Sequence, residues 1–259
     1  MPVVSSSGAD IAYEAHGDVS APALIFLNSI GSVRAMWDRQ RHAFAGTCRV
    51  IQYDARGHGQ SSVPPGPYTI AQLAGDALAI LDAEHIAEAH VCGLSLGGIT
   101  ALRLAVDAPR RVRSLVMANT GARIGSVEFW DTRMALVRER GMAAVADVAI
   151  PNWFTAGFRE REPDTVQQFR AAIESTPVEG YLGCSAAMRE EDLRDALSAV
   201  RCPVLAIAGT VDRSTPPELL HFVHERLPDS RLVTLEAAHI SNVEQEAAFN
   251  NALSTFIAA

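Results

Sequence analysis

Short apolar segments alternate with amphipathic segments along most of the chain. The apolar segments are rich in branched aliphatic residues and are typical of strands that are buried on both faces of a sheet. They span residues 23–28, 49–53, 89–94, 114–118, 203–208 and 231–235. Because helical periodicity fills most of the intervals between them, the pattern predicts an α/β fold, a mostly parallel sheet flanked by helices.

Helix-end signals place several of the intervening helices. Thr69 begins one of them, and Gln72, three residues later, completes a capping box. Another helix is expected over residues 98–108, where Pro109 stops it. The last helix is expected to begin at Ser241, with Glu244 as its capping-box partner.

The alternation is interrupted in the middle of the chain. Residues 123–190 carry helical patterns without strand segments, and strands resume only after them. The sequence therefore predicts one core domain, residues 1–122 and 191–259, interrupted by a helical cap over residues 123–190.

The motif Gly93-Leu94-Ser95-Leu96-Gly97 lies between a predicted strand and a predicted helix. A serine in that position sits on a sharp turn, and the glycines on either side relieve its steric crowding. The turn would project the Ser95 hydroxyl above the edge of the sheet. This context is typical of the nucleophile of α/β-hydrolases, so we expect Ser95 to be the nucleophile.

A serine hydroxyl needs a base to become nucleophilic. Of eight histidines, His239 lies directly after the last strand, where the base follows the nucleophile and the acid in this fold. Asp212 follows the preceding strand and is the expected acid, because Asn119, at the end of an earlier strand, carries no charge. His58, in a turn after residues 49–53, is interpreted as a residue that fixes its loop.

Two backbone N–H groups are the expected oxyanion donors. One belongs to Leu96, directly after the nucleophile, and the other to Ile30, in the loop after the strand at residues 23–28.

Composition narrows the function further. The chain has 259 residues and a formal net charge of −8, and this negative charge argues against nucleic acid or an anionic membrane as partner. The chain has no lysine, which excludes Schiff-base chemistry on a lysine side chain. The four cysteines are far apart and form no CxxC pair, which favours reduced thiols in a cytoplasmic protein. With no metal-ligand cluster, no phosphate-binding loop, no signal-like N-terminus and no apolar run of membrane-spanning length, we expect neither a cofactor nor a membrane anchor.

Over nearly its whole length the chain resembles the 3-oxoadipate enol-lactonases of aromatic catabolism. The segments that carry the resemblance include LNSIGS at 27–32, MWD at 36–38, WDTR at 130–133, NWFTAGF at 152–158 and YLGCSAAMREEDLR at 181–194. Those that distinguish this family from other α/β-hydrolases are the Asn-Ser pair at 28–29 in place of the common His-Gly, WDTR, WFTAGF at 153–158 and AAMREEDLR at 186–194. The resemblance implies an α/β-hydrolase fold and a small anionic lactone as substrate, opened to 3-oxoadipate in the β-ketoadipate pathway.

The substrate carboxylate then requires a cation. Arg133 and Arg189 lie in the family-like segments and are the candidates, while Trp153 and Trp37 are candidates for the wall of the pocket.

Other functions share this framework. A general carboxylesterase or perhydrolase would use the same triad, and so would a hydrolase that cleaves C–C bonds. A non-catalytic ligand receptor of this fold is a remote alternative, because a receptor has no need of a base beside a serine.

Overall fold

The computed structural model describes residues 1–227 and 229–259. Its centre is an eight-stranded sheet in the order β1-β2-β4-β3-β5-β6-β7-β8, in which β1, β2 and β4 pair antiparallel and all other neighbours are parallel. The strands are β1 (Val3–Ser6), β2 (Ala9–His16), β3 (Ala23–Leu27), β4 (Arg49–Tyr53), β5 (Ala89–Leu94), β6 (Val112–Ala118), β7 (Val204–Gly209) and β8 (Ser230–Leu235). The predicted α/β fold is confirmed.

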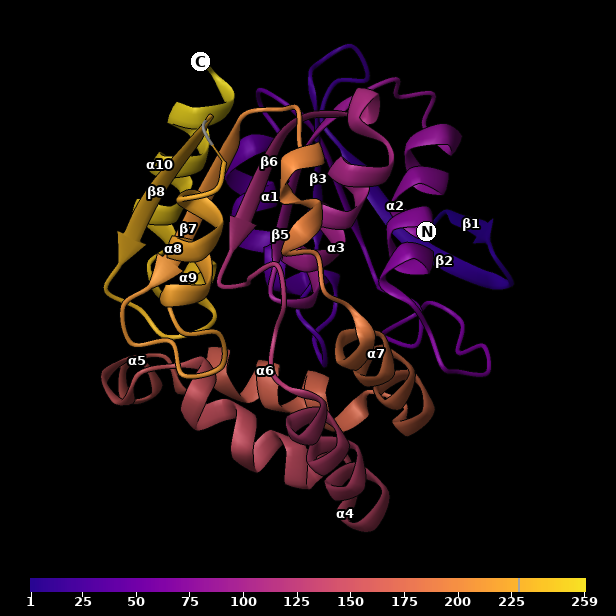
Figure 1. Cartoon of the computed structure of the whole chain (residues 1–259), viewed down its shortest axis with the longest axis vertical. Coiled ribbons are helices and arrows are strands. Elements are labelled where there is room, and N and C mark those ends of the chain that lie inside the picture. The colour runs from indigo at the N-terminus through magenta and orange to yellow at the C-terminus, as the bar shows by residue number, and fades with distance from the viewer. Residues whose placement is uncertain (228) are drawn as a thin grey trace.

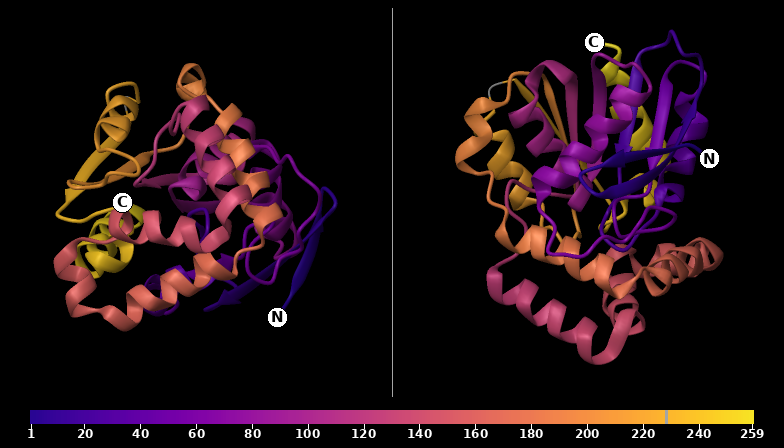
Figure 2. Two further views of the ribbon diagram at one scale, coloured as in Figure 1. Left: turned by 90° about the horizontal axis from the view of Figure 1, so that it is seen from below. Right: turned by 90° about the vertical axis from the view of Figure 1, so that its right-hand side faces the viewer.

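Helices cover both faces of this sheet (Figure 1, Figure 2). On one face α2 packs against α3, and on the other α1 packs against α10. The core helices are α1 (Asp38–Phe44), α2 (Ile70–Ala83), α3 (Leu96–Asp107), α8 (Glu218–His224), α9 (Ser241–Glu244) and α10 (Glu246–Ile257), with short 3₁₀ helices at Arg34–Trp37, Pro109–Arg111 and Asp195–Ala199.

Four further helices form a separate layer across the carboxyl ends of the parallel strands (Figure 1). They are α4 (Val127–Trp153), α5 (Ala156–Arg161), α6 (Pro163–Ser175) and α7 (Val178–Glu190), and we call them the cap. Gly141, with φ of 72°, bends α4 in its middle. The cap helices thus lie within the stretch where the sequence predicts a helical insertion, and directly over the turn that carries Ser95.

The capping box of α2 is present as predicted. The Gln72 N–H donates to Thr69 Oγ1 at 3.1 Å, and the Thr69 N–H donates to Gln72 Oε1 at 3.0 Å. The box predicted at Ser241 and Glu244 is wrong. Ser241 Oγ donates instead to Asn119 Oδ1 at 2.5 Å, and Glu244 accepts from Ala238 and Thr155. Both side chains are buried, so tertiary donors and acceptors replace the local ones.

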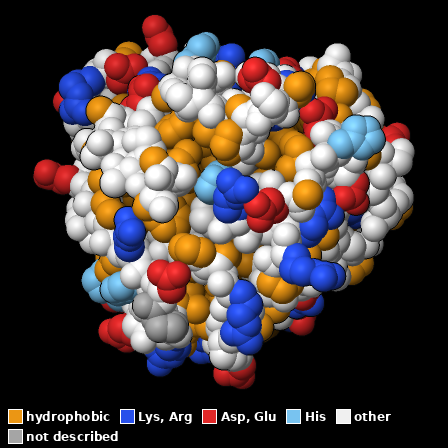
Figure 3. Space-filling view, turned by 90° about the horizontal axis from the view of Figure 1, so that it is seen from above, with side chains coloured by type: hydrophobic (Ala, Val, Ile, Leu, Met, Phe, Trp, Pro, Cys, Tyr) orange, Lys and Arg blue, Asp and Glu red, His pale blue; other side chains and the backbone are white. Residues whose placement is uncertain are grey.

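The face of the molecule opposite the cap carries acidic and basic side chains interspersed among small apolar areas (Figure 3). On this face the net negative charge is therefore distributed and does not form one acidic patch. Among the helices that the structure describes, none has the length and apolar character needed to span a bilayer.

Candidate active site

Ser95 lies at the tight turn between β5 and α3. Its backbone has φ of 59° and ψ of −116°, a conformation that residues other than glycine rarely adopt. The turn is held by hydrogen bonds from the Ser95 N–H to the Ala118 carbonyl at 3.1 Å and from Thr120 Oγ1 to the Ser95 carbonyl at 2.8 Å. A strained serine fixed in this way can present its hydroxyl in one direction.

The glycines beside Ser95 are required by close backbone contacts. A Cβ on Gly93 would lie 2.1 Å from the Gly97 carbonyl oxygen, and a Cβ on Gly97 would lie 2.1 Å from the Leu27 carbonyl oxygen. The two glycines are therefore needed for the turn and also for the close packing of β3, β5 and α3 around it.

His239 and Asp212 meet beside this turn. His239 Nδ1 lies 2.9 Å from Asp212 Oδ2, and both side chains are almost completely buried. Since the Asp212 carboxylate fixes the Nδ1–H tautomer, Nε2 is left as the basic nitrogen. Ser95 and His239 line the same cavity.

The Asp212 carboxylate receives further donors from its own loop and from Asn119, the residue after β6. The Ser214 and Thr215 N–H groups donate to Oδ1 at 2.8 and 3.0 Å, and Asn119 Nδ2 donates to Oδ2 at 2.9 Å. Burial raises the pKa of this carboxyl, but His239 and these donors outweigh that effect and hold the pKa below its ordinary value. Asp212 is thus ionised at neutral pH, and Asn119 supports it.

The loop after β3 presents a backbone donor to the cavity. Among the described residues, its Ser29, Gly31 and Ser32 N–H groups already donate to other atoms, while the Ile30 N–H does not. Leu96 is the first residue of α3, so its N–H has no acceptor within the helix. The two N–H groups expected to form an oxyanion hole are therefore both available.

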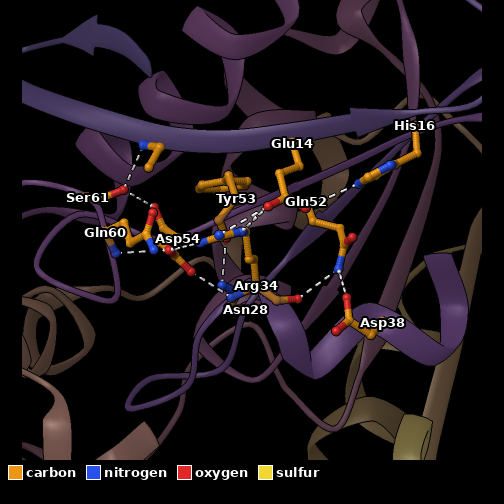
Figure 4. A network of polar contacts seen from close by, with 11 residues as sticks. Glu14, His16, Asn28, Arg34, Asp38, Gln52, Tyr53, Asp54, Gln60 and Ser61 are labelled. Atoms are coloured by element: carbon orange, nitrogen blue, oxygen red, sulfur yellow. Dashed lines mark hydrogen bonds and ion pairs between the residues drawn. The ribbon is translucent and has the colours of Figure 1, made fainter. Parts of the chain in front are cut away.

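This loop is anchored at both ends (Figure 4). Before it, Asn28 Nδ2 donates to the Tyr53 carbonyl at 2.7 Å. After it, the Arg34 N–H donates to the buried Asp54 carboxylate at 2.7 Å, and the Arg34 guanidinium pairs with the same carboxylate. The position of Ile30 is thereby determined by the end of β4.

A cavity of about 100 Å³ lies between this edge of the sheet and the cap. Its described lining combines apolar and aromatic side chains with two arginines and includes no carboxylate: Ser29, Ile30, Ser95, Ile124, Phe129, Trp130, Arg133, Ala149, Asn152, Trp153, Tyr181, Met188, Arg213, Ser214, Thr215 and His239. In the part of the chain that the structure describes, neither arginine lies within ion-pairing distance of a carboxylate. In a protein with net charge −8, such a cavity favours an anionic ligand.

Of the pocket residues expected from the sequence, the structure brings two to this cavity. Arg133 lies with its guanidinium 5.5 Å from the centre of the Phe129 ring. The ring centre of Trp153 lies 6.2 Å from that of His239, so Trp153 forms the wall of the cavity beside His239.

The structure places the other two expected residues elsewhere. Trp37 is buried in the core, where it stacks on Phe26 at 4.6 Å between ring centres, because the 3₁₀ helix after the oxyanion loop turns its apolar side to the sheet. Arg189 lies on the outer side of α7, with its Nε 2.7 Å from Asp131 Oδ1 and a second ion pair to Glu190. Neither Trp37 nor Arg189 is therefore part of the described cavity lining, which corrects the expectation from the sequence.

Comparison with known proteins places this architecture in a family. A model of the alpha/beta hydrolase fold matches residues 22–246. The chain belongs to the α/β-hydrolase family. Within it, the chain is 44% identical over 241 residues to 3-oxoadipate enol-lactonase 2 of Acinetobacter baylyi, covering 93% of this chain and 90% of that one.

Two further matches agree with the first. The chain is 33% identical over 255 residues to 3-oxoadipate enol-lactonase 1 of the same organism, covering 98% and 96% of the two chains. The crystal structure of the enol-lactonase from Burkholderia xenovorans LB400 superimposes with a TM-score of 0.97 at 38% identity and full coverage of both chains. The resemblance predicted from the sequence segments is confirmed.

Several cavity residues of this α/β-hydrolase were not singled out from the sequence, among them Trp130, Tyr181 and Arg213. Trp130 and Tyr181 belong to the same family-like segments as Arg133 and Arg189, so only their orientation was missing. Arg213 directly follows Asp212, a position that could have suggested its proximity to the site.

Proposed function

We propose that this protein hydrolyses 3-oxoadipate enol-lactone to 3-oxoadipate, with Ser95 as nucleophile, His239 as base and Asp212 as the supporting acid. The observation that carries the proposal is the cavity, which combines Ser95 and His239 with Arg133 and Arg213 and has no carboxylate in its described lining. Similarity to three enol-lactonases over most of the chain supports the choice of this lactone among anionic esters.

In the first half of the reaction, His239 Nε2 takes the proton of the Ser95 hydroxyl while the Ser95 oxygen attacks the carbonyl carbon of the lactone ring. The N–H groups of Ile30 and Leu96 stabilise the resulting oxyanion, and losing one such donor typically costs about 10²–10³-fold in rate. Cleavage of the ring C–O bond gives an acyl-enzyme and an enolate oxygen. The proton held by His239 neutralises that enolate, which ketonises and no longer closes the ring.

In the second half, His239 takes a proton from water, whose oxygen attacks the acyl carbon. The Ser95 oxygen leaves with that proton, and the product is a dicarboxylate. A cation in the cap neutralises the substrate carboxylate, and Arg133 is the candidate, since Arg189 is paired on the outside of the cap.

We place the reaction in the cytoplasm, in the β-ketoadipate branch of aromatic catabolism. All four cysteines are free thiols, and three of them are buried, as expected for a protein that does not depend on oxidising conditions.

The experiment that tests the proposal follows the ultraviolet absorbance of freshly generated enol-lactone with the purified protein. We expect rapid loss of the lactone and slow turnover of p-nitrophenyl acetate. Ser95→Ala is expected to abolish both reactions, and Asp212→Asn to slow both by about 10⁴-fold. If the acetate is turned over and the lactone is not, the protein is a general esterase of this family and the substrate proposed here is wrong.

A further inference from the structure

Thr215 lies where the acid and the base of the proposed triad meet. It is 3% exposed and contributes to the lining of the cavity that holds Ser95 and His239. Its Oγ1 lies 2.7 Å from Asp212 Oδ2 and 3.2 Å from His239 Nδ1. Since a hydroxyl carries one proton and two lone pairs, this one group can serve both neighbours.

The direction of the contacts follows from the chemistry of the three groups. An ionised carboxylate only accepts hydrogen bonds, so the Thr215 hydroxyl donates its proton to Asp212 Oδ2. The Nδ1–H of His239 donates to the same oxygen at 2.9 Å, and a lone pair of Thr215 Oγ1 is left for this N–H. The proton on His239 Nδ1 therefore has two acceptors, the carboxylate and a hydroxyl that the carboxylate itself holds.

Thr215 also holds the other oxygen of the same carboxylate. Its backbone N–H donates to Asp212 Oδ1 at 3.0 Å, while its hydroxyl donates to Oδ2. Two donors from one residue, one on each oxygen, oppose rotation of the carboxylate about its Cβ–Cγ bond. The loop after β7 thereby keeps Oδ2 directed at the imidazole before any substrate arrives.

We infer that Thr215 is a positioning residue of the triad, whose hydroxyl keeps the Asp212 carboxylate and the His239 imidazole aligned during proton transfer. The inference rests on the proposed triad but not on the identity of the lactone. When His239 takes the proton of Ser95 it becomes an imidazolium, and its Nδ1–H must keep its acceptors while this charge appears. A hydroxyl that is already fixed by Asp212 meets this need without reorganisation.

The test compares Thr215→Val, which keeps the shape of the side chain and removes the hydroxyl, with Thr215→Ser, which keeps the hydroxyl and removes the methyl group. Thr176→Val is the matched control. Thr176 is also 3% exposed and its hydroxyl donates to the Ala172 carbonyl at 2.9 Å, but it lies at the end of α6, outside the described cavity lining.

Each variant is measured for turnover of the enol-lactone and of p-nitrophenyl acetate. The rate at which a fluorophosphonate labels Ser95 is measured as well, because this labelling needs an activated serine but no lactone. Thermal unfolding establishes that every variant folds, and Ser95→Ala is the control for labelling at the nucleophile.

We expect Thr215→Val to lower kcat for both substrates, and the labelling rate, by about 10-fold or more, because a hydrogen bond to a charged group is lost. KM for the lactone should change little, since the hydroxyl acts through His239. Thr215→Ser should restore most of the lost rate, and Thr176→Val should retain wild-type rates.

Three outcomes would overturn the inference. Wild-type rates in Thr215→Val would make the hydroxyl dispensable. Equal losses in Thr215→Val and Thr215→Ser would show that the shape of the side chain matters and its hydroxyl does not. A higher KM for the lactone with unchanged kcat and labelling would make Thr215 a substrate-binding residue.

A failure of the proposed substrate would look different. If the wild-type protein does not consume the enol-lactone, but Thr215→Val slows acetate turnover and labelling and Thr215→Ser restores both, the proposed substrate is wrong and the role of Thr215 stands.

Discussion

The Gly31 N–H donates a hydrogen bond to His58 Nε2 at 2.9 Å. The other ring nitrogen, Nδ1, lies 3.1 Å from the Arg56 carbonyl, so the imidazole is neutral, with its proton on Nδ1. His58 thus fixes the residue that follows the Ile30 N–H, which agrees with its interpretation as a loop-fixing residue. His58 therefore supports the oxyanion loop through the Gly31 N–H and does not itself line the cavity in the described structure.

Replacing His58 should therefore impair the oxyanion loop. We expect His58→Ala to lower kcat by about 10-fold or more, since the Gly31 N–H loses its acceptor and the loop its position. His58→Gln can accept from Gly31 through its amide oxygen and should retain more activity. His42→Ala, on the exposed side of α1, is the control. Equal activities for the two His58 variants would contradict this role.

The same histidine should make stability depend on pH. Burial lowers the pKa of the His58 imidazole, because burial disfavours the charged form. The unfolded chain, with an ordinary histidine pKa of about 6.5, then binds the proton more readily than the folded protein. The stabilisation is complete above that pH and is lost as the pH falls below it, by at most about 1.4 kcal/mol per pH unit. Urea unfolding between pH 7 and 5 should show a smaller decrease for His58→Gln than for the wild type.

The two arginines predicted from the sequence should behave differently. Arg133 lines the cavity, while Arg189 forms ion pairs on the outside of the cap. We expect Arg133→Ala to raise KM for the enol-lactone by about 10-fold or more while leaving p-nitrophenyl acetate nearly unaffected, because only the lactone carries a carboxylate. Arg189→Ala should change neither substrate's kinetics. If Arg189→Ala raises KM and Arg133→Ala does not, the geometry described for the cavity is not that of the working enzyme.

Glu244 should couple the cap to the loop of His239. Its Oε2 accepts from the Ala238 N–H at 2.9 Å, and its Oε1 accepts from the Thr155 N–H at 3.2 Å and from the Thr155 hydroxyl. Glutamine has only one accepting oxygen, so Glu244→Gln leaves an N–H donor facing an amide group. We expect a loss of about 1–3 kcal/mol in the free energy of unfolding and a lower kcat.

The control for this substitution is Glu160→Gln, at an exposed position of α5. Both variants are compared by urea unfolding and by turnover of the lactone. Wild-type stability in Glu244→Gln would show that these hydrogen bonds do not hold the cap and the His239 loop together.

A close glycine contact docks the cap on the core. A Cβ on Gly180, in α7, would lie 2.0 Å from the Gly57 carbonyl oxygen. Gly180→Ala should therefore push α7 outward and lower the free energy of unfolding by about 1–3 kcal/mol. Gly75→Ala is the matched control, because a Cβ there would meet open space in the described structure. An alanine in that helix should instead add about 0.5–1 kcal/mol.

The two substitutions should thus change the free energy of unfolding in opposite directions, which urea unfolding of each variant measures. The adjacent Tyr181 lines the cavity, so Gly180→Ala should also raise KM for the lactone. A Gly180→Ala protein as stable as the Gly75→Ala protein would mean that the cap does not pack as described.

The sequence by itself determined the layered fold, since apolar strands and amphipathic helices have different periodicities. It also indicated Ser95, Asp212 and His239, because each follows a strand and the carboxyl ends of parallel strands share one edge of the sheet. The sequence did not predict the first hairpin, β1 and β2. Several of its residues are exposed or half-buried, so the two strands show no continuous apolar run.

Only the tertiary structure decided which side chains face the cavity. Trp37 and Trp153 are both aromatic residues in family-like segments, yet one packs into the sheet and the other against His239. In the same way Ser241 and Glu244 have the spacing of a capping box but bind partners far away in the chain. Spacing along a chain describes neighbours on one element, whereas the direction of a buried side chain depends on the elements that pack against it.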